Sequence, residues 1–483
     1  MKTARLCRLA IASSLAASVC LPADRIVVDC SRTLYRTDPL FFGINTLFWI
    51  DDDASRADGA YRQSVAALGA KLLRYPGGMG GNNFHWRENR LHDIDRFPYE
   101  DGPEKMDFDE FIELCRQTGA EPIVVVNAES WIMDGGDIAD GAAEAADWVR
   151  YCKEKGYRVH YWEIGNEVYH HVRLGAEDYA RLILRYAEAM KAADPAIRIG
   201  AVGHWDYLDV GAGDRCSPED RAALIEAERA VAGKEATAAF KQFSKSRIEQ
   251  DRRKGEPRWW PTVFEIAGAE IDFAVVHWYF GASLVPQLDS AIRDLKAFLD
   301  EKAGRPVPLA MTEWNVGSEM QKSMTRFEHD LIIAEAAARF LDGGIAMGAY
   351  WPARIRAGNY TLIDYNDNSL TDSGKLFAAL SAATLERRVA AQGPEGAYVF
   401  ATAGETSETL RVWIVNRSDR AFPDATLAID GAAIAALQAQ TYVEGQMEPA
   451  PAPLPAASAA GTFAISIPPR SCTIVSGATR PGF

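Results

Sequence analysis

Two glutamates, Glu167 and Glu313, each stand at the end of a short apolar stretch of strand-forming residues. Glu167 follows Gly165 and Asn166, and Glu313 follows the run that begins at Pro308. Cleavage of a glycosidic bond uses two carboxyl groups that face each other across the sugar. The two glutamates are 146 positions apart, which leaves room for several strand–helix units, so both side chains can reach one end of a barrel. The pair predicts a glycosidase-type site with Glu167 and Glu313 as catalytic residues.

The two carboxyl groups need different environments in a retaining mechanism. One attacks the anomeric carbon as a carboxylate while the other protonates the leaving oxygen, and the two groups lie about 5 to 5.5 Å apart. A neighbouring guanidinium or phenol favours the ionised form of a carboxyl group. Arg74 and Tyr279 are the residues that we expect to hold Glu313 ionised.

Residues suited to sugar binding collect where the predicted strands end. Aromatic faces stack on the apolar faces of sugar rings, and Asn, Arg and His side chains form hydrogen bonds with hydroxyl groups. Asn166, which precedes Glu167, is placed to bond the hydroxyl next to the anomeric carbon. The expected substrate-binding residues are Arg74, Asn82, Asn127, Asn166, His277, Tyr279 and Trp351.

Apolar runs and amphipathic helices alternate through the middle of the chain. Alternation of this kind indicates parallel strands joined by helical crossovers. Amphipathic patterns predict helices over 107–118, 142–155 and 178–193. The predicted strands are 41–45, 71–75, 122–127, 161–164, 197–202, 273–277, 308–312 and 346–351. Together they predict an α/β fold, a (β/α)8 TIM barrel over 41–385 with its chemistry at the C-terminal strand ends.

The rest of the chain predicts a second domain and one insertion. Short half-buried strands over 386–483 predict a C-terminal β-sandwich, and the N-terminal strand within 24–40 is expected to complete it. The stretch 211–261 is too long for an ordinary connection. We interpret it as an insertion that either shapes substrate access or forms a packing or oligomer contact.

Composition and the N-terminus narrow the classes of function. The formal charge of −15 disfavours nucleic acid and anionic membrane surfaces as partners. Residues 1–23 carry basic residues followed by an apolar segment, the layout of a signal peptide, so we expect a secreted or periplasmic protein without membrane insertion. Cys30 and Cys472 are either a disulfide, if their strands are neighbours, or buried thiols.

These motifs also resemble a known family. The segments around Arg74, Glu167, His277 and Glu313 resemble the α-L-arabinofuranosidases of glycoside hydrolase family 51, in a large clan of retaining barrel enzymes. The resemblance implies Glu167 as acid/base, Glu313 as nucleophile and Asn166 as a sugar ligand. It also implies a barrel capped by a β-sandwich that includes the N-terminal strand. β-Xylosidases and uronic-acid hydrolases of the same clan remain alternatives.

Other readings of the sequence lead to different experiments. The chain lacks a His-Glu-x-x-His motif and a Gly-Lys-Ser/Thr phosphate loop, so neither a metal nor another cofactor is expected. A metal-dependent barrel hydrolase would be inhibited by chelators. A carbohydrate-binding barrel that had lost catalysis would bind sugars without cleaving them. The expected partner is a carbohydrate substrate, and formation of a homo-oligomer is left open.

Overall fold

The structure is a computed structural model in which part of the chain can be described. The predicted leader and most of the 211–261 stretch lie outside the described residues. The described residues are 24–92, 102, 104–170, 173–208, 217, 219, 221–223, 225–226, 259–356, 360–434, 436–455 and 462–478.

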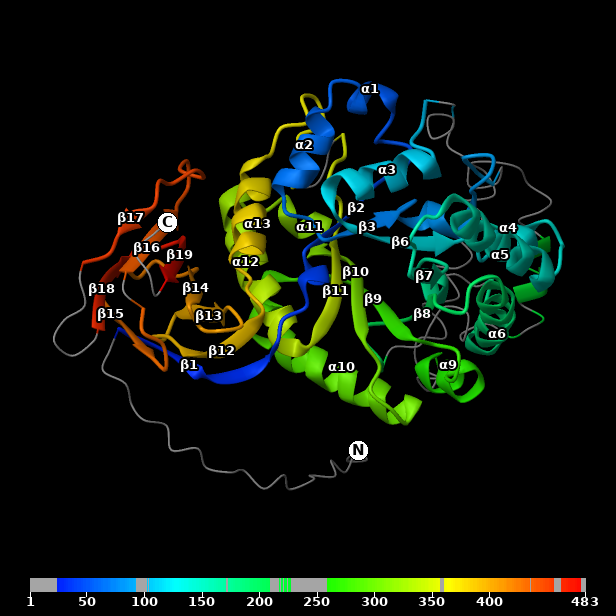
Figure 1. Ribbon diagram of the computed structural model, residues 1–483. Helices are drawn as coiled ribbons and strands as arrows, with labels where there is room; N and C mark the ends of the chain where they lie inside the picture. The colour runs from blue at the N-terminus through cyan, green and yellow to red at the C-terminus, as the bar shows by residue number, and fades with distance from the viewer. Residues whose placement is uncertain are drawn as a thin grey trace.

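Eight parallel strands close into a barrel, as the sequence predicts (Figure 1). Their order around the barrel is β10-β11-β2-β3-β6-β7-β8-β9, which follows the order along the chain. The strands are β2 (Gly43–Asn45), β3 (Leu72–Tyr75), β6 (Glu121–Val126), β7 (Tyr161–Ile164), β8 (Arg198–Val202), β9 (Phe273–Phe280), β10 (Leu309–Val316) and β11 (Ile345–Tyr350).

Helices surround these strands and connect them. In the described residues they are α1 (Asp53–Arg56), α2 (Ala60–Ala67), α3 (Phe108–Thr118), α4 (Ser130–Met133), α5 (Ile138–Lys155), α6 (Ala176–Ala193), α9 (Trp259–Ala267), α10 (Leu288–Ala303), α11 (Ser318–Gln321), α12 (Arg326–Gly343) and α13 (Asp372–Ala382). Short 3-10 turns follow several strands, namely η2 (Met79–Asn83), η3 (Val168–His170) and η5 (Ala282–Gln287), and η1 (Pro39–Phe41) precedes β2. A small hairpin, β4 (Phe84–His85) with β5 (Arg90–Leu91), follows η2.

The predicted helices are present, and α6 begins two residues and α5 four residues earlier than their apolar patterns suggest. Helix α5 starts at Ile138, four residues before the predicted 142. Asp137 caps this end, and Asp140 bonds back to the backbone N–H of Asp137, so the capping box defines the first turn. Hydrophobic periodicity alone does not detect such a start.

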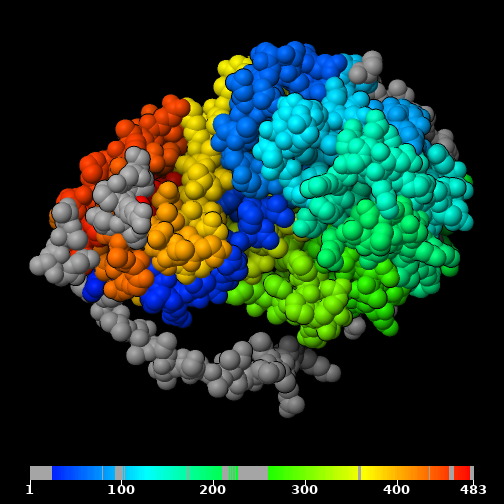
Figure 2. Space-filling view, viewed as in Figure 1, coloured from blue at the N-terminus to red at the C-terminus, as the bar shows by residue number. Residues whose placement is uncertain are grey.

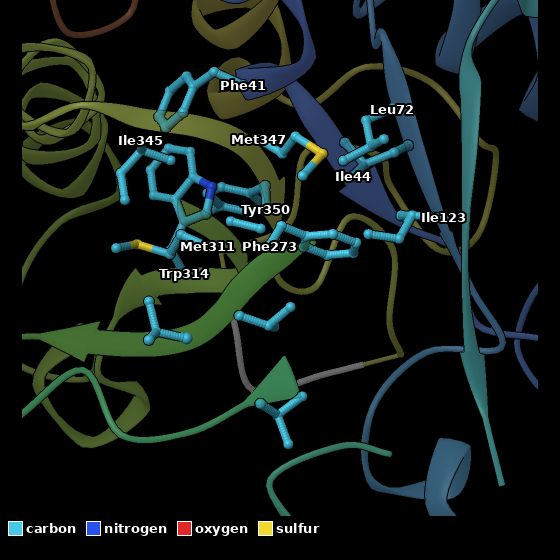
Figure 3. Close-up of a cluster of buried hydrophobic side chains, with 14 of the residues drawn as sticks. Phe41, Ile44, Leu72, Ile123, Phe273, Met311, Trp314, Ile345, Met347 and Tyr350 are labelled. Atoms are coloured by element: carbon cyan, nitrogen blue, oxygen red, sulfur yellow. The ribbon is translucent and has the colours of Figure 1, made fainter. Parts of the chain in front are cut away.

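Apolar side chains fill the barrel. Phe41, Ile44, Leu72, Phe273 and Met311 are all buried and belong to one hydrophobic cluster (Figure 3). This core fixes how the strands tilt and therefore which of their residues reach the C-terminal rim.

The C-terminal residues and the N-terminal strand form one sheet, which curls on itself to make the predicted sandwich. The order of its nine described strands is β17-β16-β19-β14-β13-β12-β1-β15-β18, and the sheet curls around a hydrophobic cluster of its own. β1 lies between β12, to which it is antiparallel, and β15, to which it is parallel. The strands are β1 (Arg25–Arg36), β12 (Arg387–Gln392), β13 (Ala397–Ala403), β14 (Thr409–Asn416), β15 (Phe422–Asp430), β16 (Ala436–Tyr442), β17 (Ala452–Pro453), β18 (Thr462–Ile467) and β19 (Ser471–Ala478).

The sheet packs against the barrel through α12 and α13, and the two parts form a continuous body (Figures 1 and 2). Cys30 of β1 and Cys472 of β19 are both buried free thiols that belong to different hydrophobic clusters. The structure therefore supports buried thiols at Cys30 and Cys472 and not a disulfide between them. Across the described residues, every helix is too short or too polar to cross a lipid bilayer.

Candidate active site

Glu167 and Glu313 converge at the C-terminal rim of the barrel. Glu313 lies in β10, and Glu167 follows the end of β7. One carboxylate oxygen of each, together with a ring nitrogen of His277 in β9, lie within 4.8 Å of one another. Two carboxyl groups this close together can act on the same anomeric carbon.

The carboxylate of Glu313 is held from two sides. Nη1 of Arg74 donates to its Oε1 at 3.0 Å, and the hydroxyl of Tyr279 donates to its Oε2 at 2.6 Å. Burial and the neighbouring Glu313 charge raise the pKa of Tyr279 well above its usual value, so the phenol keeps its proton and remains a donor. These are the two residues that the sequence predicts as partners of Glu313.

Tyr279 also presents a surface at the rim. Its side chain is 41% exposed although its hydroxyl is bonded to Glu313. An aromatic face that is open to solvent beside a buried carboxylate suits stacking on a sugar ring.

Glu167 sits in an unusual backbone conformation. Its φ is 49°, in the left-handed region that residues other than glycine seldom adopt. The preceding Gly165 has a φ of 75°, so the chain turns sharply as it leaves β7 and directs Glu167 toward β9. Such strain is often retained where a side chain must point to a fixed place.

His277 lies between the two carboxylates. Its Nδ1 is 2.9 Å from Oε1 of Glu167 and 3.6 Å from Oε2 of Glu313, and its Nε2 is 3.1 Å from the hydroxyl of Thr312. Burial lowers the pKa of His277 to about 4, so the ring is neutral near pH 7. A neutral imidazole can share a proton with Glu167 without adding a fixed positive charge to the site.

Asn166 is fixed by Arg74 and by Asn82. Nη2 of Arg74 donates to its Oδ1 at 2.7 Å, while its Nδ2 is buried without a partner among the described residues. Asn82 clamps the backbone of Asn166, because its Oδ1 accepts from the N–H at 2.6 Å and its Nδ2 donates to the carbonyl. Asn166 therefore offers a donor to a ligand, whereas both ends of the Asn82 amide bond to the backbone of Asn166 and position it.

Two further expected substrate ligands occupy different surroundings. The amide of Asn127 donates to Ser130 and Glu144 and accepts from the N–H groups of Glu129 and Ser130, so its hydrogen bonds stabilise the turn after β6. Trp351 follows β11 at the rim, and a Cβ at Gly78 would lie 2.6 Å from its ring. The structure thus brings Arg74, Asn166, His277 and Tyr279 to the carboxylates and uses the amides of Asn82 and Asn127 within the protein.

Three residues of this network are not among the sequence-predicted site residues. Glu163 of β7 pairs with Arg74, Asn45 of β2 accepts from Arg74 at 3.0 Å, and Thr312 supports His277. Thr312 directly precedes Glu313, Glu163 lies four residues before Glu167, and Asn45 ends a predicted strand. Their positions in or near the ends of predicted strands were the signal that could have found them. Which of them pair with Arg74 is decided only when the barrel closes.

Glu167, His277 and Glu313 form the one cluster in the described residues whose donor atoms are close enough to hold a metal ion. The guanidinium of Arg74, ion-paired to Glu313 at 3.0 Å, would repel a cation placed there. Both oxygens of Glu313 already have hydrogen-bond donors. The arrangement therefore suits acid/base and nucleophilic chemistry by the carboxyl groups themselves.

The protein is a (β/α)8 barrel with a carboxylate pair at its C-terminal rim. Comparisons with known proteins show which barrel enzymes it resembles. A family model for the alpha-L-arabinofuranosidase 1 domain matches residues 64–210. A probable alpha-L-arabinofuranosidase C of Aspergillus fumigatus is 27% identical over 188 residues, which are 32% of this chain and 35% of that protein. An intracellular exo-alpha-(1->5)-L-arabinofuranosidase of Acetivibrio thermocellus is 22% identical over 305 residues, which are 55% of this chain and 50% of that protein. The chain thus covers between about a third and a half of the length of these relatives.

Solved structures share the whole architecture. The family 51 alpha-L-arabinofuranosidase of Thermotoga petrophila aligns over 94% of this chain and 99% of its own, with a TM-score of 0.68 at 19% identity. A xyloglucanase of family 44 from Paenibacillus polymyxa aligns over the same shares, with a TM-score of 0.64 at 14% identity. The chain has the barrel-and-sandwich fold of these enzymes, and it resembles the family 51 arabinofuranosidases, as its motifs predict.

Proposed function

We propose that this protein is a retaining glycoside hydrolase in which Glu313 is the nucleophile and Glu167 the acid/base. The single observation that carries the proposal is the carboxylate pair, whose oxygens lie within 4.8 Å of each other at the C-terminal rim. Glu313 is paired with Arg74, which favours its ionised form, while Glu167 contacts a neutral histidine. This asymmetry supports the division of roles.

The reaction proceeds in two steps. Glu313 attacks the anomeric carbon, the bond from that carbon to the leaving oxygen breaks, and Glu167 gives its proton to the leaving oxygen. A glycosyl ester on Glu313 results. In the second step Glu167 takes a proton from water, the resulting nucleophile attacks the anomeric carbon, and Glu313 leaves as a carboxylate.

The substrate class that we propose is the α-L-arabinofuranoside. The family model and the relatives with arabinofuranosidase names support it, together with the open donor of Asn166 beside Glu167. A panel of aryl glycosides tests this choice, with arabinofuranosides, β-xylosides and uronides side by side. Release of the aryl group from arabinofuranosides is expected, and faster release from β-xylosides or uronides would reassign the substrate.

Two variants test the roles of the carboxyl groups. Glu313→Gln is expected to lose turnover by at least about ten-thousandfold while the protein stays folded. Azide is expected to restore activity to Glu313→Gly and to give the glycosyl azide of inverted configuration, because the small anion replaces the carboxylate as nucleophile. Unchanged turnover in Glu313→Gln would refute the role of Glu313.

A carbohydrate-binding barrel without catalysis is the alternative from another class. It would bind the sugar of the aryl glycosides without releasing the aryl group. Both carboxylates are present and converge, which favours the hydrolase. Chelator treatment separates a third case, because activity that is lost with EDTA and restored by a metal would identify a metal-dependent hydrolase.

We also propose that the protein is exported and that residues 1–23 are removed. The charged and then apolar layout of this segment supports the proposal. N-terminal sequencing of the mature protein from the cell envelope or the medium is expected to find a start after this segment. A start at Met1 in the cytoplasm would contradict export.

A further inference from the structure

Glu163 is a fully buried carboxylate that the two-step reaction does not use. Its side chain lies in β7 and has no exposed surface. Its Oε2 accepts from Nε of Arg74 at 2.9 Å, and Nη2 of Arg74 is also 2.9 Å away. Its Oε1 is buried and has no hydrogen-bond partner among the described residues. A bare, buried carboxylate oxygen is costly, and a purely structural contact with Arg74 would not require one.

The guanidinium of Arg74 lies between Glu163 and Glu313. Its Nη1 donates to Glu313 and to Asn45, each at 3.0 Å, and its Nη2 donates to Asn166. One positive charge therefore serves two carboxylates, both of them nearly or fully buried. In a site of low polarity, the negative charge of Glu163 repels that of Glu313. This repulsion offsets part of the stabilisation that Arg74 gives to the ionised Glu313.

We propose that Glu163 is a positioning residue that holds Arg74 in this fork and, by sharing its charge, keeps Glu313 a reactive nucleophile. The inference rests on the proposed hydrolase function. A carboxylate paired with an arginine of its own is easily ionised but weakly nucleophilic, since the stronger ion pair lowers its basicity. Glu163 offsets part of that effect while its contacts with Nε and Nη2 keep the guanidinium aligned.

The charged and titratable groups around Glu313 come from four elements of the barrel. They are Arg74 on β3, Glu163 on β7, Glu167 after β7, Tyr169 on η3, and His277 and Tyr279 on β9. Burial keeps His277 neutral and Tyr279 protonated near pH 7. Among the described residues Glu313 is bonded by Arg74 and Tyr279 and not by Glu163, so Glu163→Gln removes a charge while both groups that donate to Glu313 remain.

The test compares three variants in the pH dependence of kcat/KM. Glu163→Gln keeps an acceptor for Arg74 and removes the charge, so the acid limb is expected to move to lower pH by about one pH unit. In the same variant kcat is expected to fall about three- to tenfold with KM unchanged, because a less basic carboxylate attacks more slowly. Glu163→Asp restores the charge and is expected to return the acid limb toward its wild-type position.

Glu335→Gln is the matched control. Glu335 of α12 is also a buried glutamate paired with arginines, Arg339 and Arg417, at 2.7 and 2.6 Å. Glu335 lies in α12, away from the strand ends that carry Glu167 and Glu313. The acid limb of kcat/KM in Glu335→Gln is therefore expected to coincide with that of the wild type. An unshifted acid limb in folded Glu163→Gln, or an equal shift in Glu335→Gln, would overturn the proposal.

A direct titration separates this inference from the proposed function. Carbon-13 NMR of protein labelled at the glutamate side-chain carboxyl carbons follows Glu313 without any turnover, with Glu313→Gln identifying its signal. The pKa of Glu313 is expected to be lower in Glu163→Gln than in the wild type and to recover in Glu163→Asp. An unchanged pKa would overturn the role of Glu163 even if glycosides are hydrolysed. A lowered pKa in a protein that cleaves no glycoside would support the charge sharing and reject the hydrolase.

Discussion

At the scale of single residues, the site depends on charges that neutralise one another in a buried place. Arg74 alone contacts Glu163, Glu313 and Asn166, so one guanidinium orients both a carboxylate and an amide at the rim. His277 contributes a neutral ring between the two acids. The result is a site in which Glu313 has donors on both oxygens and Glu167 has a partner able to share its proton.

The neutral state of His277 predicts a pH dependence of stability. Its pKa is lowered from 6.5 to about 4 in the folded protein, so between these values the unfolded chain binds a proton that the folded chain does not. The free energy of unfolding is therefore expected to fall as the pH falls from about 7 to about 4, and His277 contributes roughly 3 kcal/mol to this loss.

His277→Gln isolates this contribution, because all other titrating groups are common to both proteins. Urea unfolding at several pH values is expected to show that the difference in unfolding free energy between wild type and variant shrinks on acidification. A difference that stays constant between about pH 7 and pH 4 would mean that folding does not lower the pKa of His277.

At the scale of elements, the turn that follows β7 determines where Glu167 points. A Cβ at Gly165 would lie 2.8 Å from Val168, 2.9 Å from Ala128 and 2.9 Å from Oδ1 of Asn82. Together with a φ of 75°, this crowding leaves glycine as the residue that fits. The turn is thus held between the end of β6, the η2 loop and η3.

Gly165→Ala tests that account, with Gly156→Ala as its control. Gly156 has a φ of 71° but open space around its Cβ position, so alanine there is expected to cost only about 1 kcal/mol and to leave activity unchanged. Gly165→Ala is expected to cost more and to reduce kcat/KM by at least about a hundredfold, because Asn82 must move and Glu167 turns away. Equal activity in the two variants would show that the turn does not position Glu167.

The elements themselves were largely predictable, and their hydrogen-bonded partners were not. Apolar runs locate every barrel strand, because strands buried on both faces carry little else. Asn82 looked like a sugar ligand because it follows a strand end, yet its amide clamps the backbone at Asn166. That contact joins residues 84 positions apart, and only the folded barrel decides it.

At the scale of the whole molecule, a polar cluster joins the curled sheet to the barrel. Asp342 in α12 accepts hydrogen bonds from Tyr35 of β1 at 2.8 Å, Tyr398 of β13 at 2.7 Å and Arg388 of β12 at 2.9 Å. The N-terminal strand thus completes the sheet and also contacts the barrel. The N-terminal strand has no place among the eight predicted barrel strands, which predicts that β1 belongs to the sheet. Neither its place between β12 and β15 nor its bond to α12 could be predicted in this way.

Asp342→Ala is expected to destabilise the protein by about 2 to 4 kcal/mol, because Arg388 and two phenols lose their common partly buried acceptor. Glu319→Ala is a control at an exposed ion pair and is expected to change stability by less than about 0.5 kcal/mol. Denaturant unfolding measures both. A loss for Asp342→Ala no larger than for Glu319→Ala would show that the cluster does not stabilise the junction.

The central claim is that Glu167 and Glu313 act on one anomeric carbon, and trapping the glycosyl ester tests it most directly. Dinitrophenyl α-L-arabinofuranoside needs no acid to leave, so in Glu167→Ala the first step is expected to outrun the second. Mass spectrometry is then expected to find one added glycosyl group, on the peptide that contains Glu313. An adduct on another residue, or hydrolysis by inversion without any adduct, would contradict the account.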